Sequence, residues 1–234
     1  MKKIALIIAY NGSLYKGFQR QPHGETVENS IEQVLVENNV IPSGFSDEEV
    51  DYSSSGRTDR GVHAVYQVIS FNSFKEPSKV IEIINRMLSP RITAWGYLDD
   101  VPWDFNARHW AKARVYLYYL GKRFFGREDI VSCIDYDRRL SVVPRQLVFG
   151  NSSVLLFKSF GFKRSEIKHI INCLTGKRGF IPGNLCLVYV GYPFKTVLYH
   201  EYLVEFLKEN SEVKIFRFLL ENKQFLDQLL LYFL

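Results

Sequence analysis

Apolar residues follow two kinds of spacing along this chain, continuous runs and helical repeats. Runs that are rich in aliphatic, β-branched and aromatic side chains predict three strands, at residues 4–10, 65–71 and 93–98. Between them, apolar positions recur at helical spacing in residues 27–39 and 78–88, with Thr26 as an N-cap and Pro90 as the end of the second helix. This alternation predicts an α+β unit in the first part of the chain.

The rest of the chain continues the pattern less regularly. Strands are expected at residues 113–119 and 154–160. A helix is expected at residues 164–174, with one inward face made of Ile167, Ile170, Ile171 and Leu174. Residues 42–51 predict a solvated connection, because they contain proline, glycine and an acidic run. Residues 121–151 are rich in arginine and turn formers and predict no definite element.

A boundary near residue 103 divides the chain into two expected α+β units, residues 1–103 and 104–234. The last part of the second unit, about residues 194–234, carries two helical patterns and ends in a run of apolar side chains. Such an end should not face water. We therefore expect this tail to pack on the core or on a second subunit.

Composition places the chain among globular proteins with a sizeable core, since it has 234 residues, of which 47% are hydrophobic and 24% charged. Its cysteines, Cys133, Cys173 and Cys186, lack Cys-x-x-Cys spacing, which argues against a disulfide framework and a zinc site. No segment reaches the roughly 20 apolar residues of a membrane span. The apolar run after Lys2 and Lys3 predicts a first strand instead of a signal peptide. We expect a cytoplasmic protein with no membrane partner.

Basic residues are concentrated in one third of the sequence. Residues 105–180 contain 15 of the 30 lysines and arginines but only 5 of the 25 acidic residues. Basic side chains interleaved with aromatic ones are what binding of a phosphate backbone and stacking of bases require. A solvated basic face is the simpler alternative, and composition alone leaves both open.

The densest cluster of chemically active side chains is Ser54-Ser55-Gly56-Arg57-Thr58-Asp59-Arg60-Gly61-Val62-His63-Ala64. Gly56 and Gly61 can adopt positive φ, which predicts a tight loop that presents Asp59. The arginines on either side favour the ionised form of this carboxylate. An aspartate in such a loop is more often a turn residue that bonds its own backbone. Asp59 and His63 lack a third ligand, so we predict no metal site.

The strand expected at residues 113–119 places Arg114, Tyr116 and Tyr118 on one face and apolar residues on the other. The polar and aromatic face has the character of a cleft lining. Packing in the core is the more frequent role of such a tyrosine row, so this pattern alone does not assign a function.

Gly56-Arg57-Thr58-Asp59-x-Gly61-Val62-His63-Ala64 resembles the active-site motif of the TruA family of tRNA pseudouridine synthases and matches every position that the motif specifies. Other segments resemble the family in the same order. They are the opening loop at residues 15–22, the Arg-x-Tyr-x-Tyr strand at 114–118, a strand-to-helix segment at 161–174, and a closing strand at 181–193.

The resemblance implies the pseudouridine synthase fold, in which two similar halves with largely antiparallel sheets meet at a central catalytic cleft. It implies isomerisation of uridine to pseudouridine in tRNA, usually in the anticodon stem-loop, by a homodimer without a cofactor. Asp59 would be the essential carboxylate, and Tyr116 would lie against the target base. Substrate contacts would come from the remaining residues: Arg57, Arg114, Tyr118, Leu185, Arg20 and Gln21.

The cation that pairs with the catalytic carboxylate in this family is an arginine, and Lys168 stands at the matching position. Lysine lacks the planar fork of arginine, so a bidentate grip on the carboxylate would be lost. Arg164, four residues earlier on the same helical face, is the alternative partner and a further candidate for substrate binding. The sequence does not choose between them.

The chain also departs from the family. Asn11 and Phe18 stand where Asp and Trp are more frequent, and Asn106 stands where many members have His. The stretch between Tyr119 and Val154 is much shorter than usual and has no counterpart of the helical insert with a His-Asp-Phe signature. Two alternatives therefore stay open: an RNA-binding protein of the same fold with impaired catalysis, and an unrelated hydrolase that uses Asp59 and His63.

Overall fold

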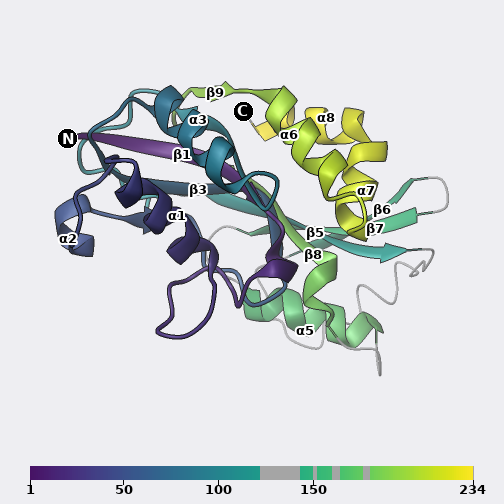
Figure 1. Ribbon diagram of the computed structural model, residues 1–234. Coiled ribbons are helices and arrows are strands. Elements are labelled where there is room, and N and C mark those ends of the chain that lie inside the picture. The colour runs from purple at the N-terminus through teal and green to yellow at the C-terminus, as the bar shows by residue number, and fades with distance from the viewer. Residues whose placement is uncertain (122–142, 150–151, 160–163, 176–179, 234) are drawn as a thin grey trace.

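The structure is a computed structural model that describes residues 1–121, 143–149, 152–159, 164–175 and 180–233 (Figure 1). Its strands are β1 (Lys2–Tyr10), β2 (Ser53–Ser54), β3 (His63–Ser73), β4 (Ile92–Leu98), β5 (Ala113–Gly121), β6 (Val143–Phe149), β7 (Ser152–Ser159), β8 (Leu185–Gly191) and β9 (Thr196–Leu198). Its helices are α1 (Val27–Glu37), α2 (Asp47–Val50), α3 (Pro77–Leu88), α5 (Arg164–Thr175), α6 (His200–Glu209), α7 (Lys214–Glu221) and α8 (Lys223–Phe233), with the 3₁₀ turns η1 (Gly12–Leu14) and η3 (Pro182–Asn184).

Within these ranges, nine strands form one sheet in the order β6-β7-β5-β8-β3-β1-β4-β9, and β2 pairs with β3. Strand β1 lies between β3 and β4 and pairs antiparallel with both. It is buried from Ile4 to Tyr10, as its continuous apolar run predicts. The mostly antiparallel α+β architecture that the sequence predicts is confirmed.

The sheet is continuous across the expected boundary near residue 103. Strand β8 joins β3 in parallel, through His63 opposite Cys186 and Ala64 opposite Leu187, and all other pairings of the described strands are antiparallel. The division into residues 1–103 and 104–234 stays a prediction. The parallel junction matters for the site, because it places the loop before β3 beside the start of β8.

The predicted helices form where expected, with one correction. The Thr26 hydroxyl accepts a hydrogen bond from the Asn29 N–H at 3.2 Å and caps α1. Helix α5 buries the four side chains predicted to point inward: Ile167, Ile170, Ile171 and Leu174. On α3, helical spacing predicts an inward face of Val80, Ile84, Met87 and Leu88; Val80, Ile84 and Leu88 are buried, whereas Met87 is 46% exposed. The buried face of α3 therefore keeps three of the four predicted residues and also includes Ile81 and Ile83.

Two loosely predicted segments are more structured than expected. Residues 42–51 contain the single-turn helix α2, with Val50 fully buried, so they are more than a solvated connection. The tail contains three helices and the strand β9, which pairs with β4, where two helices were expected. Buried side chains such as Phe206, Phe216 and Leu219 pack α6 and α7 on the core. The side chains of the final apolar run lie outside the described part.

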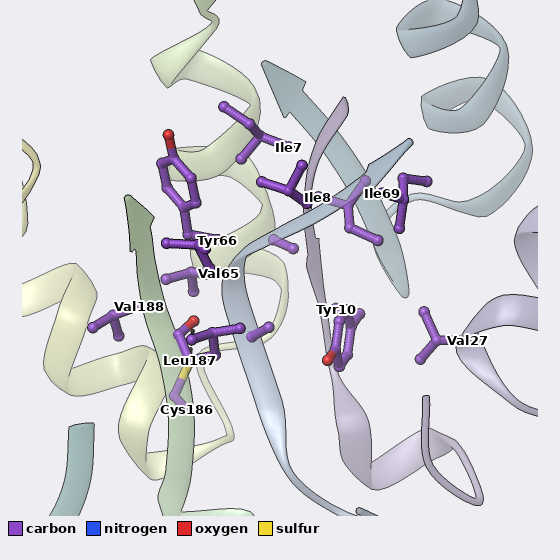
Figure 2. Packing of buried hydrophobic residues seen from close by; sticks show 14 of the residues in the cluster. Ile7, Ile8, Tyr10, Val27, Val65, Tyr66, Ile69, Cys186, Leu187 and Val188 are labelled. Carbon is purple, nitrogen blue, oxygen red and sulfur yellow. Dashed lines mark hydrogen bonds between the residues drawn. The ribbon is translucent and has the colours of Figure 1, made fainter. Parts of the chain in front are cut away.

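The core extends across the strands on both sides of the parallel junction. Figure 2 shows Tyr10 of β1 facing Val27 at the start of α1, and Val65 of β3 beside Leu187 of β8. All four side chains are fully buried. Figure 1 shows α6, α7 and α8 grouped near β5 and β8, with α5 on the other side of these strands in that view. None of the helices in the described ranges combines the length and apolarity that a bilayer crossing requires.

Candidate active site

The loop that presents Asp59 is fixed through its neighbour Thr58. The Thr58 hydroxyl forms a buried hydrogen bond of 2.8 Å with the Tyr10 hydroxyl, and its carbonyl accepts from the Phe18 N–H at 3.1 Å. Gly17, at φ 120°, allows the opening loop to approach, because a Cβ there would lie 3.3 Å from the Thr58 oxygen. The backbone immediately before Asp59 is thus held on two sides.

Buried polar side chains support the start of the same loop. The Ser55 hydroxyl donates to Gln67 Oε1 at 2.8 Å and accepts from the Val68 N–H at 3.1 Å. The Gln67 amide donates to the Gly56 carbonyl, and Arg114 Nε donates to the Ser55 carbonyl at 2.8 Å. These bonds satisfy the buried polar groups and fix the loop against β3 and β5.

Asp59 forms an ion pair with Lys168 of α5, in which Nζ lies 2.7 Å from Oδ2. The two side chains are 37% and 40% exposed, so the pair is partly screened by water, although the Oδ2 atom of Asp59 is itself buried. Of the two cations that the sequence offered, Lys168 contacts the carboxylate. Arg164 begins α5, and its side chain lies outside the described part.

Aromatic side chains extend from this ion pair to strand β5. Lys168 Nζ lies 5.4 Å from the centre of the Phe180 ring, a cation–π distance. Phe180 stacks on Tyr118 with the ring centres 6.0 Å apart. The Tyr118 hydroxyl accepts from the Ile181 N–H at 3.2 Å, and burial raises the pKa of this phenol. The stacked rings of Phe180 and Tyr118 form an aromatic platform, and Lys168 contacts this platform as well as Asp59.

Tyr116 lies on the strand face that looks towards this assembly. Strand β5 keeps a regular register with β7 from Arg114 to Tyr119, so Arg114, Tyr116 and Tyr118 share one face. Arg114 reaches the loop and Tyr118 reaches the platform beneath Lys168. Tyr116 stands between them and is 5% exposed.

The structure corrects the expectation that this strand face lines an open cleft. Arg114 is 3% exposed and donates to the backbone carbonyls of Ser55 and Arg108, so it supports the loop where a contact with substrate was predicted. Tyr118 is buried under Phe180. Leu185, predicted to contact a base, is fully buried at the start of β8.

The remaining predicted residues lie on the surface. Arg57 is exposed in the loop, two positions before Asp59. Arg20 is exposed and pairs with Glu32 of α1 at 3.3 Å, while the Gln21 amide donates to the Lys16 carbonyl at 3.2 Å. Gly61 adopts the predicted positive φ of 80°, whereas Gly56 is not among the residues with positive φ.

Sequence reasoning missed Phe180, Gln67 and the Tyr10–Thr58 bond. Gln67 could have been recognised from the sequence, because it is a polar residue inside an otherwise apolar strand. A buried amide requires hydrogen-bond partners, which predicts a contact with a neighbouring segment. Phe180 could not have been recognised in this way, because its contact with Lys168 depends on how α5 packs.

His63, the other chemically active residue of the motif, is buried and contacts both the turn after β1 and helix α7. Its Nδ1 accepts from the Gly12 N–H at 3.1 Å, and its ring meets Phe216 of α7 edge-on at 4.7 Å between centres. Burial lowers the pKa of His63 to about 4, although a backbone hydrogen bond to Gly183 opposes this shift. This neutral, enclosed ring is not arranged as the base of a hydrolase. No cluster of three or more potential metal ligands occurs in the described ranges.

His63 should make the protein less stable as the pH falls from 6.5 to 4. Its folded-state pKa of about 4 lies below the ordinary value near 6.5, so the unfolded chain binds more protons in this window. Its contribution is complete above pH 6.5 and is lost at up to about 1.4 kcal/mol per pH unit below it. Urea unfolding at several pH values measures this slope.

A His63→Asn variant isolates the effect of this residue, because asparagine can accept from Gly12 and does not titrate. We expect the variant to be less stable at pH 7 and to show a flatter pH dependence. Equal slopes for the two proteins would contradict the assignment of the acid sensitivity to His63.

The chain is similar to archaeal proteins named tRNA pseudouridine synthase A. It is 40% identical over 132 residues to the protein of Thermococcus kodakarensis, covering 56% of this chain and 48% of that protein. It is 39% identical over 166 residues to that of Methanosarcina acetivorans, covering 71% and 56%. For Thermococcus sibiricus, 42% identity over 118 residues covers 50% and 42%. The chain spans about half the length of the curated relatives it matches.

These relatives confirm the resemblance to the TruA family that the Asp59 motif predicts. No protein-family profile matches the chain. Among solved structures, a chain of a Cbf5-Nop10-Gar1 complex aligns with 83% of this chain and 60% of its own length, at 14% identity. The TM-score of 0.36 is too low to establish a shared fold.

Proposed function

We propose that this chain, a relative of the tRNA pseudouridine synthase A proteins, converts uridine to pseudouridine in tRNA. The observation that carries the proposal is the ion pair of Asp59 and Lys168, since it joins the motif loop to the helix that the family resemblance marks. A partly exposed carboxylate held in one orientation by a cation and a braced loop suits chemistry on a bound nucleotide. The anticodon stem-loop is the expected target region.

The reaction is an isomerisation, so its atoms balance without a co-reactant. The bond between N1 of uracil and C1′ of ribose breaks, the base turns, C5 bonds to C1′, and the proton from C5 is released as N1 regains one. Asp59 acts either as the nucleophile at C1′ or as a base at the ribose. A stacked uridine is out of reach of the carboxylate, so the nucleotide must be flipped out of the RNA helix at a cost of a few kcal/mol.

Other residues have supporting roles in this proposal. Arg57, exposed beside Asp59, occupies the space that the flipped base vacates or contacts a phosphate. Tyr116 stacks on the uracil, and Leu185 excludes water from the site. Both side chains are buried in the structure, so stacking on Tyr116 requires a rearrangement that exposes it. Arg20 and Gln21, on the exposed opening loop, contact the RNA.

The assembly and location of the protein are part of the proposal. A homodimer whose two subunits share one tRNA follows from the family resemblance, as does catalysis without a cofactor. Cys173 and Cys186 are free thiols in the structure, which fits a reducing cytoplasm, where tRNA is available.

Release of tritium from C5 of labelled uridine tests the function directly. The protein is incubated with tRNA that carries tritium at C5 of uridine, and pseudouridine is then mapped in the product. Released tritium together with a mapped pseudouridine supports the proposal. Tight tRNA binding without release supports the impaired RNA-binding alternative, and a cleaved RNA on a gel supports a hydrolase.

Replacing Lys168 with methionine should reduce the isomerisation rate about 10- to 100-fold. The variant removes the charge that orients Asp59 but keeps the length of the side chain, whereas Lys168→Arg keeps the charge and should retain most of the activity. Single-turnover rates with saturating tRNA separate this effect from weaker binding.

Lys79→Met is the matched control, because Lys79 also forms an ion pair, with Glu82 of α3 at 2.6 Å. We expect this variant to react at the wild-type rate. If Lys168→Met were as active as Lys79→Met, the ion pair with Asp59 would have no part in catalysis.

A further inference from the structure

The C-terminal tail reaches the turn after β1 through a buried pair of amide side chains. Asn11 lies directly after β1, and Asn210 ends α6. Asn11 Nδ2 donates to Asn210 Oδ1 at 2.9 Å, across 199 positions of sequence, and both side chains are buried. This hydrogen bond is used by none of the catalytic steps above, although Asn11 lies between Tyr10 and Gly12, which both contact the Asp59 loop.

The surrounding carbonyl groups fix the orientation of the Asn210 amide. Its Nδ2 donates to the Phe206 carbonyl at 2.9 Å and to the Pro90 carbonyl at 3.0 Å. A reversed amide would lose both bonds and place its oxygen against two carbonyl oxygens. Asn210 Oδ1 therefore faces Asn11 and requires a donor there.

Asn11 supplies this donor while its own oxygen stabilises the turn. Its Oδ1 accepts from the N–H and the hydroxyl of Ser13, at 3.2 and 2.6 Å. Residue 11 is also a position where the chain departs from the TruA pattern, in which aspartate is more frequent. An aspartate could accept from Ser13 but has no N–H for Asn210. The amide at position 11 thus matches the tail of this chain.

The turn that Asn11 begins packs on the end of the Asp59 loop. A Cβ on Gly12 would lie 2.0 Å from the Val62 carbonyl oxygen, so the two backbones are in direct contact. The Gly12 N–H also donates to His63 Nδ1 at 3.1 Å. The Val62 N–H in turn donates to the Asp59 carbonyl at 3.1 Å and closes the turn that carries the carboxylate. A displacement of Asn11 therefore reaches Asp59 through consecutive contacts.

From these contacts we infer that Asn210 is a positioning residue for the Asp59 loop and acts through Asn11. The inference rests on the proposed function for the reaction that the loop serves. Loss of the bond would leave the Asn11 amide buried without an acceptor, which favours a shifted or open turn. A misplacement of about 1 Å can lower a reaction rate about 100-fold, so a small shift at Asp59 is enough to be measured.

Amide hydrogen exchange, followed by NMR, tests this coupling without any substrate. Asn210→Ala removes the acceptor for Asn11. We expect the Gly12 and Val62 amides to exchange about tenfold faster in this variant, after correction for the change at the amides of the central strand β1, which report global unfolding. Equal changes at the loop and at β1 would show that Asn210 stabilises the fold as a whole, and would overturn the inference.

Asn222→Ala is the matched control, because Asn222 caps α7 as Asn210 caps α6. Its Nδ2 donates to the Phe218 carbonyl at 2.8 Å, four residues earlier, just as Asn210 donates within α6. We expect Asn222→Ala to keep wild-type exchange at Gly12 and Val62 relative to β1. If the two variants had the same exchange profile, the role of Asn210 at the loop would be contradicted.

Asn11→Asp repeats the test from the other side of the pair, and it serves alone if Asn210→Ala does not fold. The change replaces one NH₂ group by oxygen and keeps the acceptor for Ser13. Exchange at Val62 should again rise about tenfold relative to β1. In the Asn210→Ala background the same substitution should add less than about twofold, because its partner is already absent. Unchanged exchange in Asn11→Asp, or additive effects of the two substitutions, would overturn the inference.

Single-turnover rates connect the coupling to the reaction. With saturating tRNA, Asn210→Ala should release C5 tritium about tenfold more slowly than the wild type, and Asn222→Ala at the wild-type rate, while the Kd for tRNA changes less than about twofold. If the wild type releases no tritium, the isomerase proposal fails, and hydrogen exchange still decides the role of Asn210. Tritium release by the wild type, with unchanged exchange and rate in Asn210→Ala, overturns the role of Asn210 and retains the isomerase.

Discussion

An Asp59→Asn variant is expected to release C5 tritium from uridine-labelled tRNA at least about 10³-fold more slowly than the wild type. The amide is neutral and nearly isosteric, so the loop braced by Tyr10, Phe18 and Ser55 should keep its shape. What is lost is the charge that faces Lys168 and the lone pair that attacks C1′ or removes a proton. Binding of tRNA, measured by filter retention, should change by no more than a few-fold.

Asp104→Asn provides the control, because it makes the same chemical change at an exposed position after β4. It should react at the wild-type rate. If Asp59→Asn retained a tenth of the activity, the carboxylate would not be the essential group and the proposed mechanism would be wrong.

Phe216→Ala is expected to destabilise the protein by about 3–5 kcal/mol, the cost of removing a buried phenylalanine side chain. Phe216 is fully buried on α7, where its ring centre lies 4.7 Å from that of His63 and 5.1 Å from that of Phe206. Domains of this class are stable by only about 5–15 kcal/mol. Thermal unfolding followed by circular dichroism should show a Tm lower by roughly 10 °C or more.

Phe74→Ala removes the same side chain from a position that is 60% exposed, and its Tm should lie within about 2 °C of the wild type. If the Tm of Phe216→Ala were equal to that of Phe74→Ala, the packing of α7 on the core would be contradicted. A loss of activity at temperatures where the variant stays folded would indicate that the tail also supports the motif loop through His63.

The elements with strong local patterns were predictable. Helix α5 and its four inward residues were predicted because the helical spacing of these residues can be read within one continuous segment of the sequence. Thr26 was assigned as a cap for the same reason. By contrast, the parallel pairing of β3 with β8 joins positions more than a hundred residues apart, and no local pattern carries that information.

The site was predictable where it lies in one segment and less so where segments meet. The motif around Asp59 was found, yet Lys168 and Arg164 share one helical face, and only the packing of α5 places Lys168 at the carboxylate. Arg114 was expected in a cleft because it alternates with apolar residues along the strand and shares a face with Tyr116 and Tyr118. Its partners, the carbonyls of Ser55 and Arg108, are supplied by the tertiary structure.

The strand order has a consequence for the chain as it leaves the ribosome. Strands β3, β1 and β4 are all present once residue 98 is made, but β9 completes the outer edge of β4, and β8 extends the pairing of β3 beyond the short β2. Until residues 185–198 emerge, backbone donors and acceptors along these edges have no strand partner and are open to other chains. A nascent polypeptide of this architecture therefore keeps unpaired strand edges after its first three strands are made, and the sheet is completed only when β8 and β9 have emerged.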